Sequence, residues 1–285
     1  MRSLLSTLVI FLVASSTGAS EANEALARAD AAWARRSEGH SGALASTVPI
    51  DEAVGAFEEA LAQEPENLAI RAQLLKALWF KGEHTGLDRD SKIAVFQQAR
   101  DLAQEAIDNL LSDLRIDRGR PTTDDIVVHL GDTDHAAEVY FWGAAHWGLW
   151  GRYRGKIASA RQGVAGKIRD YAEVVIALDE HVEGAGGRRI MGRLHTEAPK
   201  LPFITGWIDR KEAIRQLEQA VELAPDDLLN RLYYLEALID FDSERRSRAV
   251  EDLRAMVDME PTVETVVEDL KILGDARELL ERVDR

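Results

Sequence analysis

The sequence predicts an all-α fold of tetratricopeptide-like stacked antiparallel helix pairs, α-solenoid-like, with an irregular helical middle. Three observations predict it: a short pattern that occurs three times, apolar residues at helical spacing through most of the chain, and no segment with sustained strand alternation. Stacked helical arrays mostly present surfaces to partners. We therefore expect a binding protein rather than a catalyst.

The repeated pattern is an alanine, a large apolar residue four positions on, a small or apolar residue three further, and a proline five further. Its copies are Ala53, Phe57, Ala60 and Pro65; Ala213, Leu217, Ala220 and Pro225; and Ala249, Leu253, Met256 and Pro261. In tetratricopeptide units this is the spacing of the second helix, and proline opens the next one. Small residues let neighbouring helices approach closely. The pattern predicts packed helix pairs at both ends of the chain.

The predicted helices of the first half begin with an alanine-rich segment over residues 21–36. Pro49 opens the first motif helix, and Pro65 separates it from an antiparallel partner over residues 68–80. A long helix over residues 90–116 follows. The next helix is predicted to start at a cap formed by Asp132 or Thr133 and to run to about Trp150.

The second half starts with a helix predicted over residues 156–181, which the glycine-rich segment 183–187 ends. Residues 194–208, with two prolines, are predicted to form an irregular connection. The second motif helix follows, and the remaining helices are expected over residues 228–241, 244–259, 263–272 and 275–283.

The N-terminus predicts a secretory signal peptide over residues 1–19. Arg2 precedes an apolar stretch from Leu4 to Ala14, and Thr17 and Ala19 suit a cleavage site. The stretch is shorter than the ~20 residues that span a bilayer, and an uncleaved anchor is the alternative. Residues 20–285 are then expected to form a single all-helical domain in the periplasm, with no membrane insertion of the mature chain.

Composition narrows the classes of function. The chain contains no cysteine, which excludes disulfides, cysteine-ligated metal and a lipid-modified cysteine after the signal. Its net charge is −15, from 50 acidic and 35 basic residues. Nucleic acid and anionic lipid both require positive patches, so we expect neither as a main partner.

Several segments carry a resemblance to a known family. They read GGRRIMGRLH at 186–195, AP at 198–199, DRKEAI at 209–214, AVELAP at 220–225, NRLY at 230–233 and YFWGAA at 140–145. In these segments the chain resembles the T component (TatT-like) of tripartite ATP-independent periplasmic (TRAP) transporters, well over roughly its second half and by architecture in the first.

The resemblance implies an all-helical extracytoplasmic protein of tetratricopeptide-like units. Such a protein assists a solute-binding component that hands small organic acids or apolar ligands to a membrane permease. The resemblance also suggests homo-oligomers. Family members are often lipoproteins, and this chain departs from them in having no cysteine for lipid attachment.

An aromatic cluster is the first candidate ligand site. Its candidate residues are Tyr140, Trp142, His146 and Trp150, and the last three share one helix face at i, i+4 and i+8. One interpretation makes them the wall of an apolar ligand cavity with a polar group inside it. The alternative is core packing, which is the usual role of aromatic residues at helical spacing.

Three arginines beside the glycines are the second candidate site. Arg188, Arg189 and Arg193 offer guanidinium groups suited to a carboxylate ligand or an acidic partner. The alternative is a solvated loop whose arginines pair with local carboxylates.

No cofactor or catalytic site is predicted. His129, Asp132, Asp134 and His135 have metal-ligand chemistry, but aspartates of this kind more commonly cap a helix. The chain has neither a Gly-x-Ser-x-Gly elbow nor a His-Glu-x-x-His motif. A helical enzyme remains only as a third interpretation.

The function expected from the sequence is that of a periplasmic, non-enzymatic adaptor similar to TRAP T components. It is expected to engage a periplasmic solute-binding protein and a small organic ligand, either apolar or a carboxylate. The alternative is a general periplasmic scaffold for envelope protein assembly that binds no small molecule.

Overall fold

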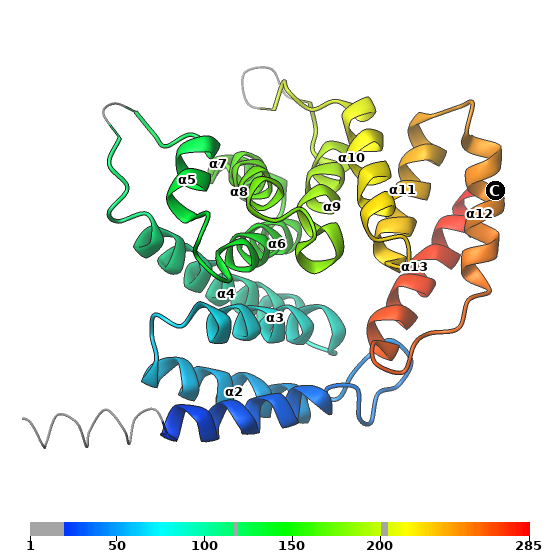
Figure 1. Cartoon of the computed structure of the whole chain (residues 1–285). Helices are drawn as coiled ribbons and strands as arrows, with labels where there is room; N and C mark the ends of the chain where they lie inside the picture. Colours follow the sequence, from blue (N-terminus) through cyan, green and yellow to red (C-terminus); the bar gives the residue numbers. More distant parts are fainter. Residues whose placement is uncertain (1–19, 117–118, 201–204) are drawn as a thin grey trace, which may run out of the picture.

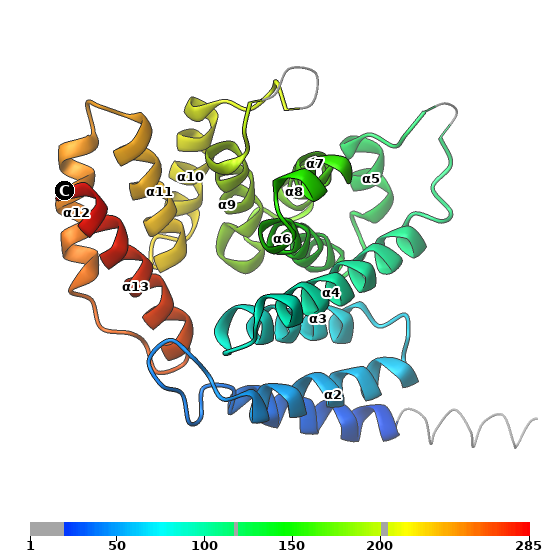
Figure 2. The same cartoon turned by 180° about the vertical axis from the view of Figure 1, so that it is seen from behind.

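The chain folds into an arc of helices, seen from two sides in Figures 1 and 2. A computed structural model describes residues 20–116, 119–200 and 205–285. Within these ranges the only β structure is two isolated bridges, Ser41 with Leu44 and Ala45 with Thr85. The predicted all-α class is therefore confirmed. The predicted signal peptide, residues 1–19, lies outside the described residues.

The first arm of the arc consists of an N-terminal helix over residues 20–34, α2 (Thr47–Gln63), α3 (Leu68–His84) and α4 (Arg89–Leu110). Polar side chains start the labelled helices: Ser46, Asn67 and Asp88 each accept a hydrogen bond from a backbone N–H in the first turn. These caps satisfy donors that a helix leaves free at its N-terminus. Helix α2 packs against α3, and α3 packs against α4.

The middle of the arc is built around α6 (Ala136–Arg154). Helices α5 (Thr123–Leu130), α7 (Lys156–Arg161), α8 (Val164–Leu178) and α9 (Val182–Glu197) complete it. Helix α6 packs against α3, α4, α8 and α9, and buried residues lie around its whole circumference. A helix that is apolar on all sides belongs in an interior. Figure 1 accordingly shows α6 at the centre of the molecule.

The second arm consists of α10 (Arg210–Leu223), α11 (Leu228–Phe241), α12 (Arg246–Val257) and α13 (Val266–Val283). Each helix packs on the next, and α13 also contacts α11 and α3. Figure 2 shows the start of α13 coming down beside the loop that follows the N-terminal helix. The two ends of the arc therefore meet.

The alanine, apolar and small residues of the repeated pattern are buried where helices pack in both arms. None of these nine residues is more than 1% exposed. The prolines of the pattern lie between α2 and α3, between α10 and α11, and between α12 and α13. In the part of the chain that the structure describes, two apolar clusters form the interior. One joins the first arm to the middle and includes Val267 at the start of α13, and the other joins α10 to α13.

Several predicted boundaries were wrong. The helix expected over residues 90–116 ends at Leu110. The helix expected over 156–181 is interrupted at Gly163, whose φ of 64° breaks it into α7 and α8. His135, with a φ of 62°, precedes α6 in place of the predicted aspartate or threonine cap. The two last predicted helices are one, because α13 runs unbroken through Gly274.

The glycine-rich segment was also misread. Positive φ angles at Glu183, Gly184 and Ala185 form a tight turn, but the helical residues that follow belong to α9. Gly186 serves close packing, since an added Cβ would lie 2.2 Å from the Phe141 ring. The three candidate arginines therefore lie on a helix rather than on a loop. None of the helices in the described ranges is both long and apolar enough to cross a bilayer.

Candidate functional site

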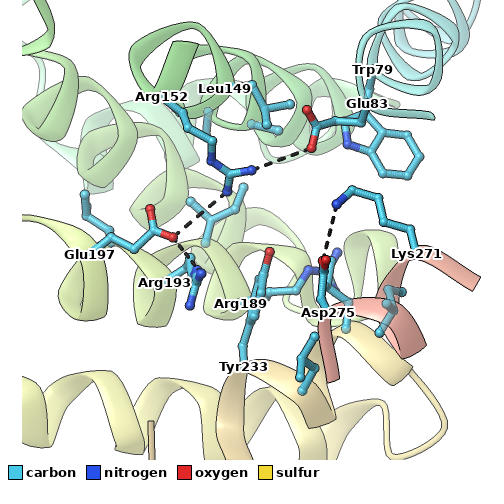
Figure 3. Close-up of a pocket in the computed structure, with 18 of the residues that line it drawn as sticks. Trp79, Glu83, Leu149, Arg152, Arg189, Arg193, Glu197, Tyr233, Lys271 and Asp275 are labelled. Atoms are coloured by element: carbon cyan, nitrogen blue, oxygen red, sulfur yellow. Dashed lines mark hydrogen bonds and ion pairs between the residues drawn. The ribbon is translucent and has the colours of Figure 1, made fainter. Parts of the chain in front are cut away.

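A cavity of about 1740 Å³ lies inside the arc. Helices α3, α6, α9, α11 and α13 all contribute to its wall, so both arms and the middle border this cavity, which is open to solvent on part of its surface. Figure 3 shows side chains from these helices converging on one space. Small-molecule sites usually measure roughly 300–1,000 Å³, so this cavity exceeds the ordinary range.

Part of the wall is aromatic and aliphatic. Trp79 of α3 and Trp142 of α6 stand with ring centroids 5.5 Å apart. The remaining apolar wall includes Leu149, Ile190, Leu194, Leu232 and Ile272. The two indoles meet because α3 and α6 pack directly against each other, although they are far apart in sequence. This surface suits the apolar part of a ligand.

An ionic network lies beside this apolar surface, where Glu83 follows Trp79 by one turn of α3 (Figure 3). Arg152 lies 3.6 Å from Glu83 and 4.0 Å from Glu197, both beyond hydrogen-bond length. Arg193 binds Glu197 at 2.7 Å and also pairs closely with Glu236. Burial lowers the pKa of Arg193, but Tyr233 and the two carboxylates outweigh it, and the net shift is upward. Both arginines are therefore permanently charged.

Arg189 lines the cavity but has a structural role. Its guanidinium donates to the carbonyls of Glu183 and Gly184 at 3.0 and 3.1 Å, and to Asn230 Oδ1 at 2.8 Å. Asn230 is fully buried in α11. The arginine thus stabilises the tight turn before α9 and joins it to the second arm.

The structure brings only part of the predicted site to the cavity. Trp142, Arg189 and Arg193 line it, whereas Tyr140, His146, Trp150 and Arg188 are not among its lining residues. Arg188 donates instead to Gln219 at 2.7 Å and to Glu180 at 2.8 Å. Arg188 lies between α9 and α10, whereas Arg189, the next residue of α9, faces the cavity.

The other three aromatic candidates are packed between helices. His146 Nε2 donates to the Leu75 carbonyl at 2.9 Å, and Trp150 Nε1 donates to Gln97 at 3.1 Å. Tyr140 is 1% exposed and sits edge-on to Tyr171. Burial, partly opposed by the bond to the Leu75 carbonyl, lowers the pKa of His146 to about 4, which keeps the imidazole neutral.

The sequence analysis missed the part of the wall that α3 and α13 supply. It includes Trp79, Glu83, His84, Glu268 and Lys271. A local signal exists in α3, where two aromatic residues, an acid and a histidine lie within one and a half turns. Nothing in the local pattern connects them with a helix near the C-terminus.

The two histidines weighed as metal ligands have ordinary protein partners. His129 Nε2 donates to the Leu110 carbonyl at 3.0 Å, and His135 pairs with Glu138 at 3.1 Å. Across residues 20–116, 119–200 and 205–285, no group of three or more metal-ligating side chains is suitably placed to hold an ion.

Compared with known proteins, the chain matches no protein-family model and no curated protein. The interpretation of the cavity therefore depends on its own chemistry. Its wall combines aromatic faces, aliphatic surface and charges of both signs, most of which pair with each other. These are features of a binding site.

Proposed function

We propose that this chain is a non-enzymatic, extracytoplasmic adaptor of tetratricopeptide-like helix pairs, similar to the T component of TRAP transporters. In this proposal the arc engages a solute-binding protein of the periplasm, and the cavity receives a small organic ligand. The observation that carries the proposal is the cavity of about 1740 Å³ inside the arc.

The packing of the arms supports the tetratricopeptide-like part of the proposal. All nine motif positions are buried, each motif proline stands between two helices, and adjacent helices pack in chain order. In such arrays each unit contacts mainly its neighbours, and the concave side is the usual binding surface.

The location of the resembling segments supports the family part. Four of the segments that resemble the T component contribute to the cavity wall: residues 140–145 of α6, 186–195 of α9, 198–199 just after α9, and 230–233 of α11. A resemblance confined to general helix packing would not have to gather around one cavity.

A capture experiment tests the adaptor role. The tagged full-length protein is incubated with periplasmic extract under gentle conditions, and retained proteins are identified by mass spectrometry. We expect retention of a solute-binding protein that pairs with a TRAP-type permease. Retention is expected to fall for Ala145→Arg, which places a charge in the cavity wall, and to persist for Val128→Arg, which lies at an 87% exposed position on α5.

The alternative scaffold function makes the opposite prediction for the same experiment. Retention of envelope-assembly proteins without any solute-binding protein, equal in both variants, would favour the scaffold and refute the transporter role.

A further inference from the structure

A polar contact joins the two ends of the arc. Arg36, just after the N-terminal helix, donates from Nε to Glu268 of α13 at 2.9 Å and from Nη2 to the Glu264 carbonyl at 2.6 Å. Both side chains of this ion pair are 11% exposed. Because a helical array joins neighbours, contact between its first and last helices is a separate feature of this chain. We call Arg36, His84, Glu268 and Lys271 the seam; all four line the cavity.

The seam contains buried polar atoms that the protein does not satisfy. His84 is 3% exposed, and neither ring nitrogen has a hydrogen-bond partner within the described part of the chain. Glu268 is buried as well, with 8% of the whole residue exposed, and its Oε2 likewise has no partner there. Buried polar atoms almost always have a partner, and leaving one unpaired is costly. Two such groups, one from each arm, line one cavity.

The surroundings of His84 keep its ring neutral. The imidazole stands 4.8 Å from the Trp79 ring and 5.0 Å from the Phe80 ring, measured between centroids. Burial is the main cause that lowers its pKa to about 3, and the positive charges of Lys271 and Arg36 add to it. A neutral imidazole has one nitrogen that donates and one that accepts.

The charges of the seam select against ionised ligand groups. Arg36 pairs with Glu268 at 2.9 Å and Lys271 pairs with Asp275 at 3.3 Å, so the charges around the seam already compensate one another. An ionised ligand group would lose its hydration there without gaining a free counter-charge. A neutral group that both donates and accepts would satisfy the unpaired atoms without adding charge. Hydroxyl and primary amide groups have this property. The aromatic wall at Trp79 and Trp142 is continuous with the seam and suits an apolar chain.

We propose that the seam is the head-group subsite of the cavity and takes the hydroxyl or amide group of a neutral amphiphile, whose apolar chain lies along the aromatic wall. The inference deepens the ligand-binding part of the function proposed above and rests on it. The ligand hydrogen-bonds to α3 through His84 and to α13 through Glu268, so its binding also stabilises contact between the two arms.

The test uses the full-length protein and four probes of equal chain length: octan-1-ol, octanamide, octanoate and octylamine. Binding is followed by tryptophan fluorescence, since Trp79 and Trp142 form the wall, and by titration calorimetry. We expect the alcohol and the amide to bind about tenfold more tightly than either ion. A neutral hydrogen bond in a buried site contributes to affinity on this scale.

Three variants locate the head group. His84→Leu removes the imidazole hydrogen bonds and is expected to weaken octan-1-ol and octanamide about tenfold while leaving octanoate unchanged. Since it also removes an unpaired polar group, the fold should be retained, and thermal unfolding checks this. His84→Gln keeps a donor and an acceptor and should retain the preference. His129→Leu, on α5 and outside the cavity lining, is the matched control.

Tightest binding by octanoate or octylamine would overturn the inference, as would equal affinities for His84→Leu and the unmodified protein. Absence of binding by all four probes would overturn it too, and the capture experiment would then decide the adaptor role by itself. Selective binding of the neutral probes without capture of a solute-binding protein would support the subsite and refute the adaptor role.

Discussion

Replacing Arg36 with alanine tests whether the ends of the arc stabilise each other. The substitution removes the ion pair with Glu268, the bond to the Glu264 carbonyl, and the stacking of the guanidinium over Trp33 at 4.5 Å. Glu268 would be left with its carboxylate buried and without its cation. The loss is therefore larger than that of one surface contact.

The expected magnitude follows from burial. Removing one partner of a buried ion pair costs about 3–5 kcal/mol. Since both side chains retain 11% exposure, we expect the lower end of that range. A domain has a total stability of about 5–15 kcal/mol, so the variant should remain folded but be clearly less stable. Arg28 of the N-terminal helix is the control, because it pairs with Glu59 of α2 and both side chains are 61% exposed. Arg28→Ala should cost less than about 1 kcal/mol.

The assay is urea unfolding followed by circular dichroism, for Arg36→Ala, Glu268→Gln and the double variant. Groups in direct contact show coupling energies of about 0.5–3 kcal/mol in such a cycle. We expect coupling toward the upper end of this range. Strictly additive effects, or a loss for Arg36→Ala no larger than for Arg28→Ala, would refute the view that the seam holds the arms together.

Three further predictions concern the interior. Gly82→Ala places a Cβ 2.3 Å from the buried Phe96 ring and should destabilise by about 1–3 kcal/mol in urea unfolding, whereas Gly55→Ala meets nothing within 4 Å and should stabilise by about 0.5–1 kcal/mol. Burial lowers the pKa of His146 from 6.5 to about 4, so its contribution to stability is complete above pH 6.5 and is lost as the pH falls toward 4. The urea midpoint should therefore decrease over this range, and less steeply in His146→Gln. The same pH profile for the variant and the unmodified protein would contradict this. Arg189→Met should cost about 3 kcal/mol or more by leaving its buried partners unpaired, and a loss under about 1 kcal/mol would be inconsistent with the role given to that side chain.

Helices were predictable from sequence because their signals are local. Apolar residues at 3.6-residue spacing located α2, α3, α10 and α11 within a few residues, and Pro65 and Pro225 located the turns between them. Helix boundaries were predicted wrongly at glycines, because a glycine can either end a helix or lie within one. Gly163 breaks a helix, whereas Gly186 and Gly274 lie within one, and the local sequence does not distinguish these cases.

The candidate site was predictable only in part. A stripe such as Trp142, His146 and Trp150 indicates a buried face, but a buried face can pack on another helix or border a cavity. In the structure only the first of these reaches the cavity. Likewise, Arg189 reaches the cavity and Arg188 does not, because adjacent helical residues point in directions about 100° apart.

By itself, the sequence determined that the chain is helical, where most helices begin and end, and which small residues lie where helices touch. These properties depend on residues within a few turns of one another. The tertiary structure decided the curvature of the arc, the cavity inside it and the seam, in which Arg36 meets Glu268 across 232 positions of sequence. Curvature is the sum of small angles at every helix pair, so the closing contact has no local signal.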